Sequence, residues 1–132
     1  MTEIQSLTGT VRRGIGTATR HLNPVSALIA HRIGLPVLYP GTLNLELPEP
    51  FNLIADATLT AEEYNKREWI KLQKCRIGGI QAAILRAQDM AHGEAHLEIV
   101  AAVCLRHELQ LSDGNSVVVE VGTGERWWRG DI

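Results

Sequence analysis

Two short polar side chains, Thr42 and Asn44, follow a turn at Pro40–Gly41 and have the spacing of a small metal site. Proline pre-sets its φ and glycine accepts a positive φ, so this dipeptide predicts a turn. Beyond it the hydroxyl and the amide alternate with leucines, and a strand puts alternate residues on opposite faces. Two neutral oxygens side by side can ligate a hard cation such as Mg²⁺ that also holds a phosphate. The same two residues are also typical of an ordinary hairpin.

A second candidate site is the glycine-containing segment 13–19, which follows a strand expected at Leu7–Val11. Its small residues let the backbone approach a ligand, and exposed amide N–H groups can hold phosphate oxygens. Arg12 and Arg13 would add positive charge. The segment matches neither the dinucleotide fingerprint nor the P-loop, and a Gly-x-Gly pair is also typical of a simple tight turn.

Composition limits the class of protein. At 132 residues the chain is expected to form one domain over residues 1–132, and 45% hydrophobic with 21% charged residues is ordinary for a soluble protein. A net charge of −2 gives no electrostatic reason for binding nucleic acid or a membrane. No apolar run is long enough to span a bilayer and the first residues do not resemble a leader, so we expect a cytoplasmic protein.

The cysteines and histidines do not predict a metal centre. Cys75 and Cys104 lie in apolar surroundings without metal-type spacing, and we expect two buried, reduced thiols. The histidines are scattered. His92 and His96 are four residues apart, but no helical pattern places them on one face, so no zinc site is expected.

Short strands and one helix make up the expected architecture. Asn23 as N-cap, Pro24 at the first helical position and Gly34 as terminator predict a helix over about residues 24–33. Thr60–Glu63 is either a capping box or a loop. The tail at Trp127–Trp128 is either a closing strand or an aromatic flap, and in a strand one indole would be exposed unless something covers it. Strands are expected at Thr42–Leu47, Arg67–Gln73, Ile80–Arg86, Leu97–Ala102 and Val117–Val121, with turns at Gly78–Gly79 and 112–115. This pattern predicts a mainly β barrel with the helix packed on it or capping it.

Three segments together resemble the archaeal CTP-dependent riboflavin kinases. Residues 9–18 are similar to the first glycine-rich motif of that family, residues 34–45 to its second, and residues 99–114 to its C-terminal motif with a Leu-Arg pair and an Asp-Gly turn. Order and approximate spacing agree over nearly the whole chain. The run Pro40-Gly-Thr-Leu-Asn44 is the most specific part of the resemblance.

The resemblance implies a compact cradle-loop β-barrel that transfers a phosphoryl group from CTP to riboflavin, giving FMN and CDP. Thr42 and Asn44 would hold Mg²⁺. Arg106 would either assist catalysis at the phosphates or pair structurally with Glu98 or Glu108. The residues expected to bind the nucleotide are Gly14, Ile15, Gly16, Thr17, Ala18 and Thr19, through backbone amides, and Val103, Cys104, Leu105 and Arg106, which would line the pocket and read the cytosine edge.

The acceptor side departs from the family pattern. In the resemblance, Met90 takes the place of a threonine and Ala95 the place of a glutamate that contact the flavin in the family, with Glu94 one residue away as a substitute. Ala18 also replaces a common glycine. Two alternatives to a riboflavin kinase therefore stay open. One is a nucleotide-dependent kinase for another small hydroxyl compound, and the other is a non-catalytic barrel that binds nucleotide or DNA, although DNA binding calls for a basic cluster.

Overall fold

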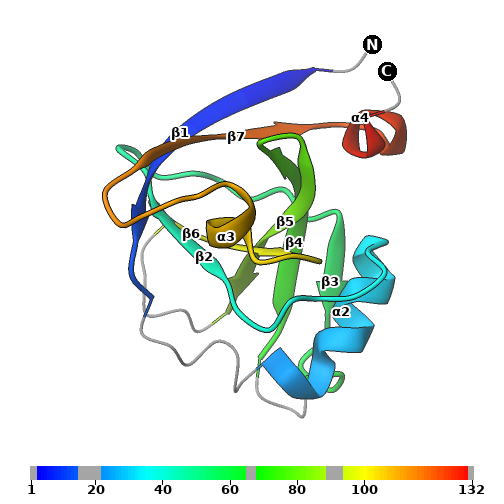
Figure 1. Ribbon diagram of the computed structural model, residues 1–132. Coiled ribbons are helices and arrows are strands. Elements are labelled where there is room, and N and C mark those ends of the chain that lie inside the picture. Colours follow the sequence, from blue (N-terminus) through cyan, green and yellow to red (C-terminus); the bar gives the residue numbers. More distant parts are fainter. Residues whose placement is uncertain (1–2, 15–21, 65–67, 89–93, 131–132) are drawn as a thin grey trace.

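The computed structural model describes residues 3–14, 22–64, 68–88 and 94–130. Six antiparallel strands close into a barrel in the order β1-β2-β6-β5-β4-β7, because β7 pairs with both β1 and β4 (Figure 1). A short β3 pairs with the first part of β4, outside the closed ring. The strands are β1 (Ile4–Arg12), β2 (Leu43–Glu46), β3 (Ala57–Leu59), β4 (Ile70–Ile77), β5 (Ile80–Ala87), β6 (His96–Ala101) and β7 (Ser116–Gly122). The mainly β barrel expected from the sequence is confirmed.

The β4–β5 hairpin follows directly from its turn residues. Gly78 and Gly79 have φ of 57° and 78°, the positive values that a two-residue hairpin turn requires at both positions. Ile77 then pairs with Ile80, and the ladder continues to the far ends of both strands. The predicted hairpin is confirmed, although β4 begins at Ile70, and Arg67 lies outside the described residues.

Two apolar layers lie on the two faces of the sheet. Inside the barrel, residues such as Leu45, Ile84 and Ile99 form one buried cluster. Leu85 and Val100 instead point outward and join a second cluster against the helix α2 (Ser26–Ile33), which runs along one side of the barrel near β3 (Figure 1). Strands buried on both faces have long apolar runs, which explains the sequence of β5.

The structure confirms the middle and the C-terminal end of the predicted helix, but the predicted start at Asn23 and Pro24 is wrong. A 3₁₀ turn η1 (Asn23–Val25) leads into α2, so Asn23 lies within the turn and its side chain caps nothing. Gly34 ends α2 in the left-handed conformation with φ of 95°. Among the described residues, no helix combines the length and the apolar character needed to cross a bilayer.

The segment at Thr60–Glu63 forms the reciprocal bonds of a capping box in a turn. The backbone N–H of Thr60 donates to the Glu63 carboxylate at 2.9 Å, and the N–H of Glu63 donates to the Thr60 hydroxyl at 3.3 Å. Arg32 of α2 also pairs with Glu63, and this pairing lowers the pKa of the Glu63 carboxyl to about 2. The turn is thereby joined to the helix.

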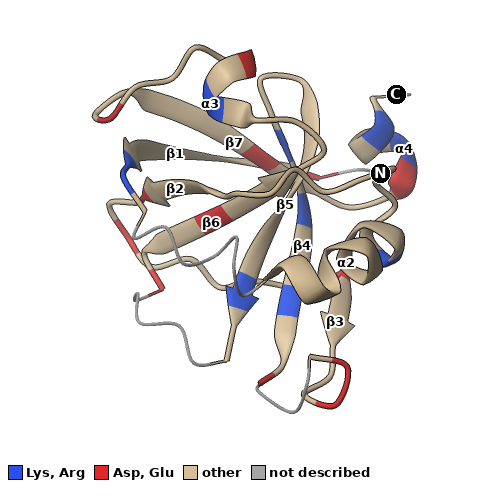
Figure 2. Cartoon of the chain, turned by 60° about the horizontal axis from the view of Figure 1, so that its bottom comes forward, with Lys and Arg blue, Asp and Glu red and all other residues tan. Residues whose placement is uncertain are grey.

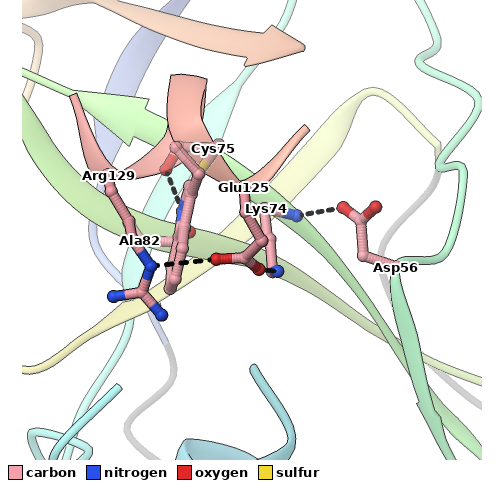
Figure 3. Close-up of polar contacts among 7 residues, drawn as sticks. Asp56, Lys74, Cys75, Ala82, Glu125 and Arg129 are labelled. Atoms are coloured by element: carbon pink, nitrogen blue, oxygen red, sulfur yellow. Dashed lines mark hydrogen bonds and ion pairs between the residues drawn. The ribbon is translucent and has the colours of Figure 1, made fainter. Parts of the chain in front are cut away.

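The tail is neither a strand nor a flap, and both tryptophans are buried. Residues Glu125–Arg129 form the one-turn helix α4, with Trp127 3% and Trp128 0% exposed. Neighbouring side chains point to opposite faces of a strand, whereas in a helix they point in more similar directions. Both indoles of α4 can therefore pack against the protein. The indole N–H of Trp128 donates to the carbonyls of Cys75 and Ala82, each at 3.0 Å (Figure 3).

Charged side chains surround the Trp128 ring. The Lys74 ammonium lies 4.9 Å and the Arg129 guanidinium 5.9 Å from the ring centroid, favourable distances for cation–π contacts. Both cations also pair with Glu125 (Figure 3). Trp128 therefore anchors α4 to Cys75 and Ala82, which pair with each other across the β4–β5 hairpin.

We predict that Trp128→Phe lowers the free energy of unfolding by about 2 kcal/mol, because it keeps most of the ring but removes the buried indole N–H that donates to two carbonyls. Chemical denaturation followed by circular dichroism measures the change. Trp69→Phe is the matched control, since the Trp69 side chain is only half-buried. Equal stability of both variants would contradict the anchoring role of the indole N–H.

Candidate functional site

Asn44 lies at the centre of the candidate site, on the outer face of the barrel. The short β2 is paired on both sides, and the ladders put Asn44 across from Arg12 of β1 and Glu98 of β6. Leu43 and Leu45 point into the interior cluster, so Asn44 points the other way. It is nevertheless only 6% exposed. The predicted alternation of this strand is confirmed, with bounds one residue shorter at each end.

Both ends of the Asn44 amide have partners. Its Nδ2 donates to the hydroxyl oxygen of Thr42 at 3.4 Å, which confirms that the two side chains share a face. Its Oδ1 lies 2.9 Å from Nε2 of His96, and since an amide oxygen only accepts, the imidazole is the donor. His96 was not predicted as a site residue. Only the pairing of β6 with β2, a contact distant in sequence, brings it to Asn44.

The first glycine-rich segment also contacts Asn44, through Gly14. A Cβ atom built on Gly14 would lie 2.4 Å from Nδ2 of Asn44, so any larger residue here would require this amide to shift. Gly14 is the one predicted residue of the phosphate loop whose surroundings are described. Ile15, Gly16, Thr17, Ala18 and Thr19 lie outside the described residues, as does Met90.

A pocket of about 210 Å³ lies between the second and third motif segments, residues 34–45 and 99–114. Its lining includes Gly41 and Thr42 after the Pro-Gly turn, and the whole of the predicted nucleotide segment Val103, Cys104, Leu105 and Arg106. Leu105 opens the short helix α3 (Leu105–Glu108), a helix that the sequence reading did not predict. Segments about sixty residues apart in the chain therefore enclose one pocket.

The two cysteines differ in their surroundings. Cys75 is fully buried in the barrel, and burial raises the pKa of its thiol. Cys104 is half-buried in the pocket, where a hydrogen bond with its side chain raises the pKa of Tyr39. The expectation of a buried thiol is correct for Cys75 and wrong for Cys104, because Cys104 lines the open pocket just before α3.

Arg106 connects the third motif segment (residues 99–114) to the first (residues 9–18). Its guanidinium pairs with Asp113 in the turn before β7, and it donates to the carbonyl of Arg12 at 3.1 Å. The expected partners Glu98 and Glu108 are wrong, because the side chain points toward β1. Arg12 itself pairs with Glu46 at 2.9 Å. Over the described chain, basic and acidic residues are interspersed on the strands and helices (Figure 2).

The acceptor-side residues chosen from the sequence lie away from Asn44. The Glu94 side chain is exposed, and its carbonyl accepts hydrogen bonds from Phe51 and Arg86. The carbonyl of Ala95 accepts from the N–H of Leu47. Both residues precede β6, whereas Glu98 within β6 is the carboxylate-bearing residue opposite Asn44. The sequence suggested Glu98 only as a partner for Arg106, and the strand register alone places it opposite Asn44.

The donor set fits a hard cation that brings its own anionic ligands. Among the described residues, no group of three or more His, Cys, Asp or Glu side chains is arranged to hold a metal ion. Thr42 and Asn44 instead place a hydroxyl and an amide side by side on one face, and each group carries a neutral oxygen. Such oxygens suit Mg²⁺ when waters or phosphate oxygens complete its shell.

Comparison with known proteins gives one consistent result. A family model named CTP-dependent riboflavin kinase, described as domain of unknown function DUF120, matches residues 11–121. A riboflavin kinase of Pyrococcus abyssi is 34% identical over 124 residues, covering 87% of this chain and 58% of that protein. A riboflavin kinase of Methanosarcina barkeri is 29% identical over 129 residues, with 90% and 57% coverage. The chain thus spans somewhat more than half the length of these relatives.

We predict that Gly14→Ala is destabilising by about 1 to 3 kcal/mol, the usual cost of overpacking, because the new methyl group displaces the Asn44 amide. In an Asn44→Ala background the same change is expected to cost much less. Chemical denaturation of the four proteins in this double-mutant cycle measures the coupling. Additive effects would mean that Gly14 and Asn44 do not contact each other.

Proposed function

The chain belongs to the CTP-dependent riboflavin kinase family, and from this membership we propose that it phosphorylates riboflavin with CTP. The hydroxyl oxygen at the end of the ribityl chain attacks the γ-phosphorus, and the bond to the β-phosphate oxygen breaks. The products are FMN and CDP, and the hydroxyl proton leaves to a base or to water. The observation that carries the proposal is the convergence of the three motif segments, through the Gly14–Asn44 contact, the Arg106–Arg12 hydrogen bond and the shared pocket.

The nucleotide is proposed to bind where the pocket and the Asn44 face meet. Val103, Cys104, Leu105 and Arg106 line the cytidine side, and the segment Gly14–Thr19 contributes backbone amides to the phosphates. Phosphoryl transfer depends mainly on positioning and on neutralising charge, which fits a site built from backbone and neutral side chains. Arg106 can add positive charge while it remains paired with Asp113.

Thr42, just before β2, and Asn44 within it are proposed to hold Mg²⁺, because their side chains lie on one face and each carries a neutral oxygen. When bound, this ion would neutralise charge on the transferring phosphate. The ladder pairing of Glu98 with Asn44 supports a role for that carboxylate in receiving the proton of the attacking hydroxyl. The Glu94 side chain, which is exposed and precedes β6, remains a weaker candidate for contacting the flavin.

A kinase for another small hydroxyl compound is the second candidate. The two acceptor-side positions chosen from the sequence, Met90 and Ala95, carry side chains that make no strong hydrogen bonds to a polar acceptor. The chain also covers only part of the relatives named riboflavin kinase. The nucleotide half of the site is therefore the better supported half.

We predict that Thr42→Val and Asn44→Leu each lower FMN formation from CTP, Mg²⁺ and riboflavin by about 100-fold or more, the scale of losing a preorganised electrostatic contact. Chromatographic assay of FMN measures this, with thermal unfolding to verify that each variant is folded. Thr42→Ser keeps the hydroxyl and should retain most of the activity. Thr8→Val, on an exposed position of β1, is the control for removing a hydroxyl elsewhere. Fully active Thr42→Val and Asn44→Leu would refute the metal assignment.

We predict that CTP with Mg²⁺ and riboflavin alone each raise the melting temperature. A ligand present at 100 times its dissociation constant stabilises the folded state by about 2.7 kcal/mol. ATP, GTP and UTP, each with Mg²⁺, are the specificity controls for the nucleotide. A shift with a nucleotide but with neither riboflavin nor FMN would favour the second candidate, and no shift with any ligand would contradict both kinases.

A further inference from the structure

The amide of Asn44 is oriented with its nitrogen toward the other proposed metal ligand. Nδ2 faces the Thr42 hydroxyl at 3.4 Å, while Oδ1 faces His96 at 2.9 Å. An amide NH₂ group only donates hydrogen bonds and cannot ligate Mg²⁺, which takes oxygen ligands. In this orientation, the side of the amide next to Thr42 is therefore unsuitable for a cation that Thr42 also binds.

We propose that the Asn44 amide makes a half-turn about its last side-chain bond when the cation binds, and that His96 is the positioning residue that supports both orientations. The half-turn exchanges the two ends of the amide, so that Oδ1 lies beside Thr42 and Nδ2 beside His96. This inference rests on the proposed function, because it takes Thr42 and Asn44 as the ligands of Mg²⁺.

The half-turn requires little rearrangement of the surroundings. The final torsion of an asparagine joins an sp³ to an sp² carbon and is roughly two-fold, so both orientations are accessible. The oxygen and NH₂ ends have similar shapes, so the close packing against Gly14 is largely kept. The bond that is given up to Thr42 is long at 3.4 Å, near the limit for a hydrogen bond.

Histidine is suited to this position because one ring nitrogen can either donate or accept. Before the turn, Nε2 of His96 carries a proton and donates to Oδ1. After the turn, Nε2 must accept from Nδ2, so the proton resides on Nδ1 of the neutral ring. A lysine here would only donate and a leucine would do neither, whereas a glutamine would do both.

Nuclear magnetic resonance of the isotope-labelled full chain with CTP, without riboflavin, tests the proposal. Spectra in slightly alkaline buffer with EDTA are compared with spectra at saturating Mg²⁺. We expect the NH₂ protons of Asn44 to show nuclear Overhauser contacts to Thr42 in EDTA and to the His96 ring in Mg²⁺. We also expect the His96 nitrogen shifts to report a change from the Nε2-protonated to the Nδ1-protonated tautomer.

Two variants sharpen the test. Asn44→Asp has an oxygen at both ends and needs no turn, so its His96 should stay protonated at Nε2 with and without Mg²⁺. His96→Gln should keep the Mg²⁺-dependent exchange of Asn44 contacts, because the glutamine amide can itself turn. A tautomer change of equal size in Asn44→Asp would show that Mg²⁺ affects His96 independently of the amide, and would overturn the proposal.

The failures of this inference and of the proposed function are distinguishable. If Mg²⁺ shifts the resonances of Thr42 and Asn44 while the Asn44 NH₂ contacts and the His96 tautomer stay unchanged, the half-turn is wrong and the metal site stands. If CTP shifts the resonances of Val103–Arg106 but Mg²⁺ leaves Thr42 and Asn44 unchanged, the metal assignment and the half-turn are both wrong. If CTP shifts neither region, the nucleotide site of the proposed function fails as well.

Discussion

The alternation of β2 is the constraint on which the candidate site depends. Leu43 and Leu45 must face the interior of a closed barrel, and a shift of one residue would reverse every side chain of the strand. Because β1 and β6 pair with β2 on its two sides, the register of Asn44 with Arg12 and Glu98 is determined from both directions. A four-residue strand can therefore hold Asn44, and Thr42 just before it, in a defined orientation without a rigid loop.

Closure of the barrel supplies the rigidity that this short strand lacks. The pairing of β4 with β7 completes the ring, and α4 anchors beside it through Trp128, whose indole N–H donates to carbonyls of β4 and β5. Closure also gives each of the six strands a neighbour on both sides, which links the ladders on either side of β2 through the rest of the barrel. The site thus lies on the wall of the barrel, with α3 and the Pro-Gly turn forming its pocket at one end.

The sequence predicted the features that depend on local chemistry and missed those that depend on distant pairing. The turn at Gly78–Gly79, the helix end at Gly34 and the shared face of Thr42 and Asn44 follow from backbone preferences and alternation. Asn23 failed as a cap because a 3₁₀ turn already includes it. The one-turn helix at the tail is too short to show a periodic pattern. His96 and Glu98 join the site only through the β2–β6 register, which one sequence does not reveal.

The neutrality of the two proposed metal ligands would determine when a cation can bind between them. A hydroxyl and an amide do little to offset the desolvation of Mg²⁺, so at the proposed site its binding would depend on phosphate oxygens from the nucleotide. The metal and the nucleotide should therefore bind cooperatively, each contributing to the affinity of the other. Without them, Asn44 satisfies both ends of its amide through Thr42 and His96, which avoids leaving a buried polar group unpaired. In the proposed half-turn these two contacts are rearranged when the metal site forms, so their stability would oppose binding of the cation until the nucleotide binds.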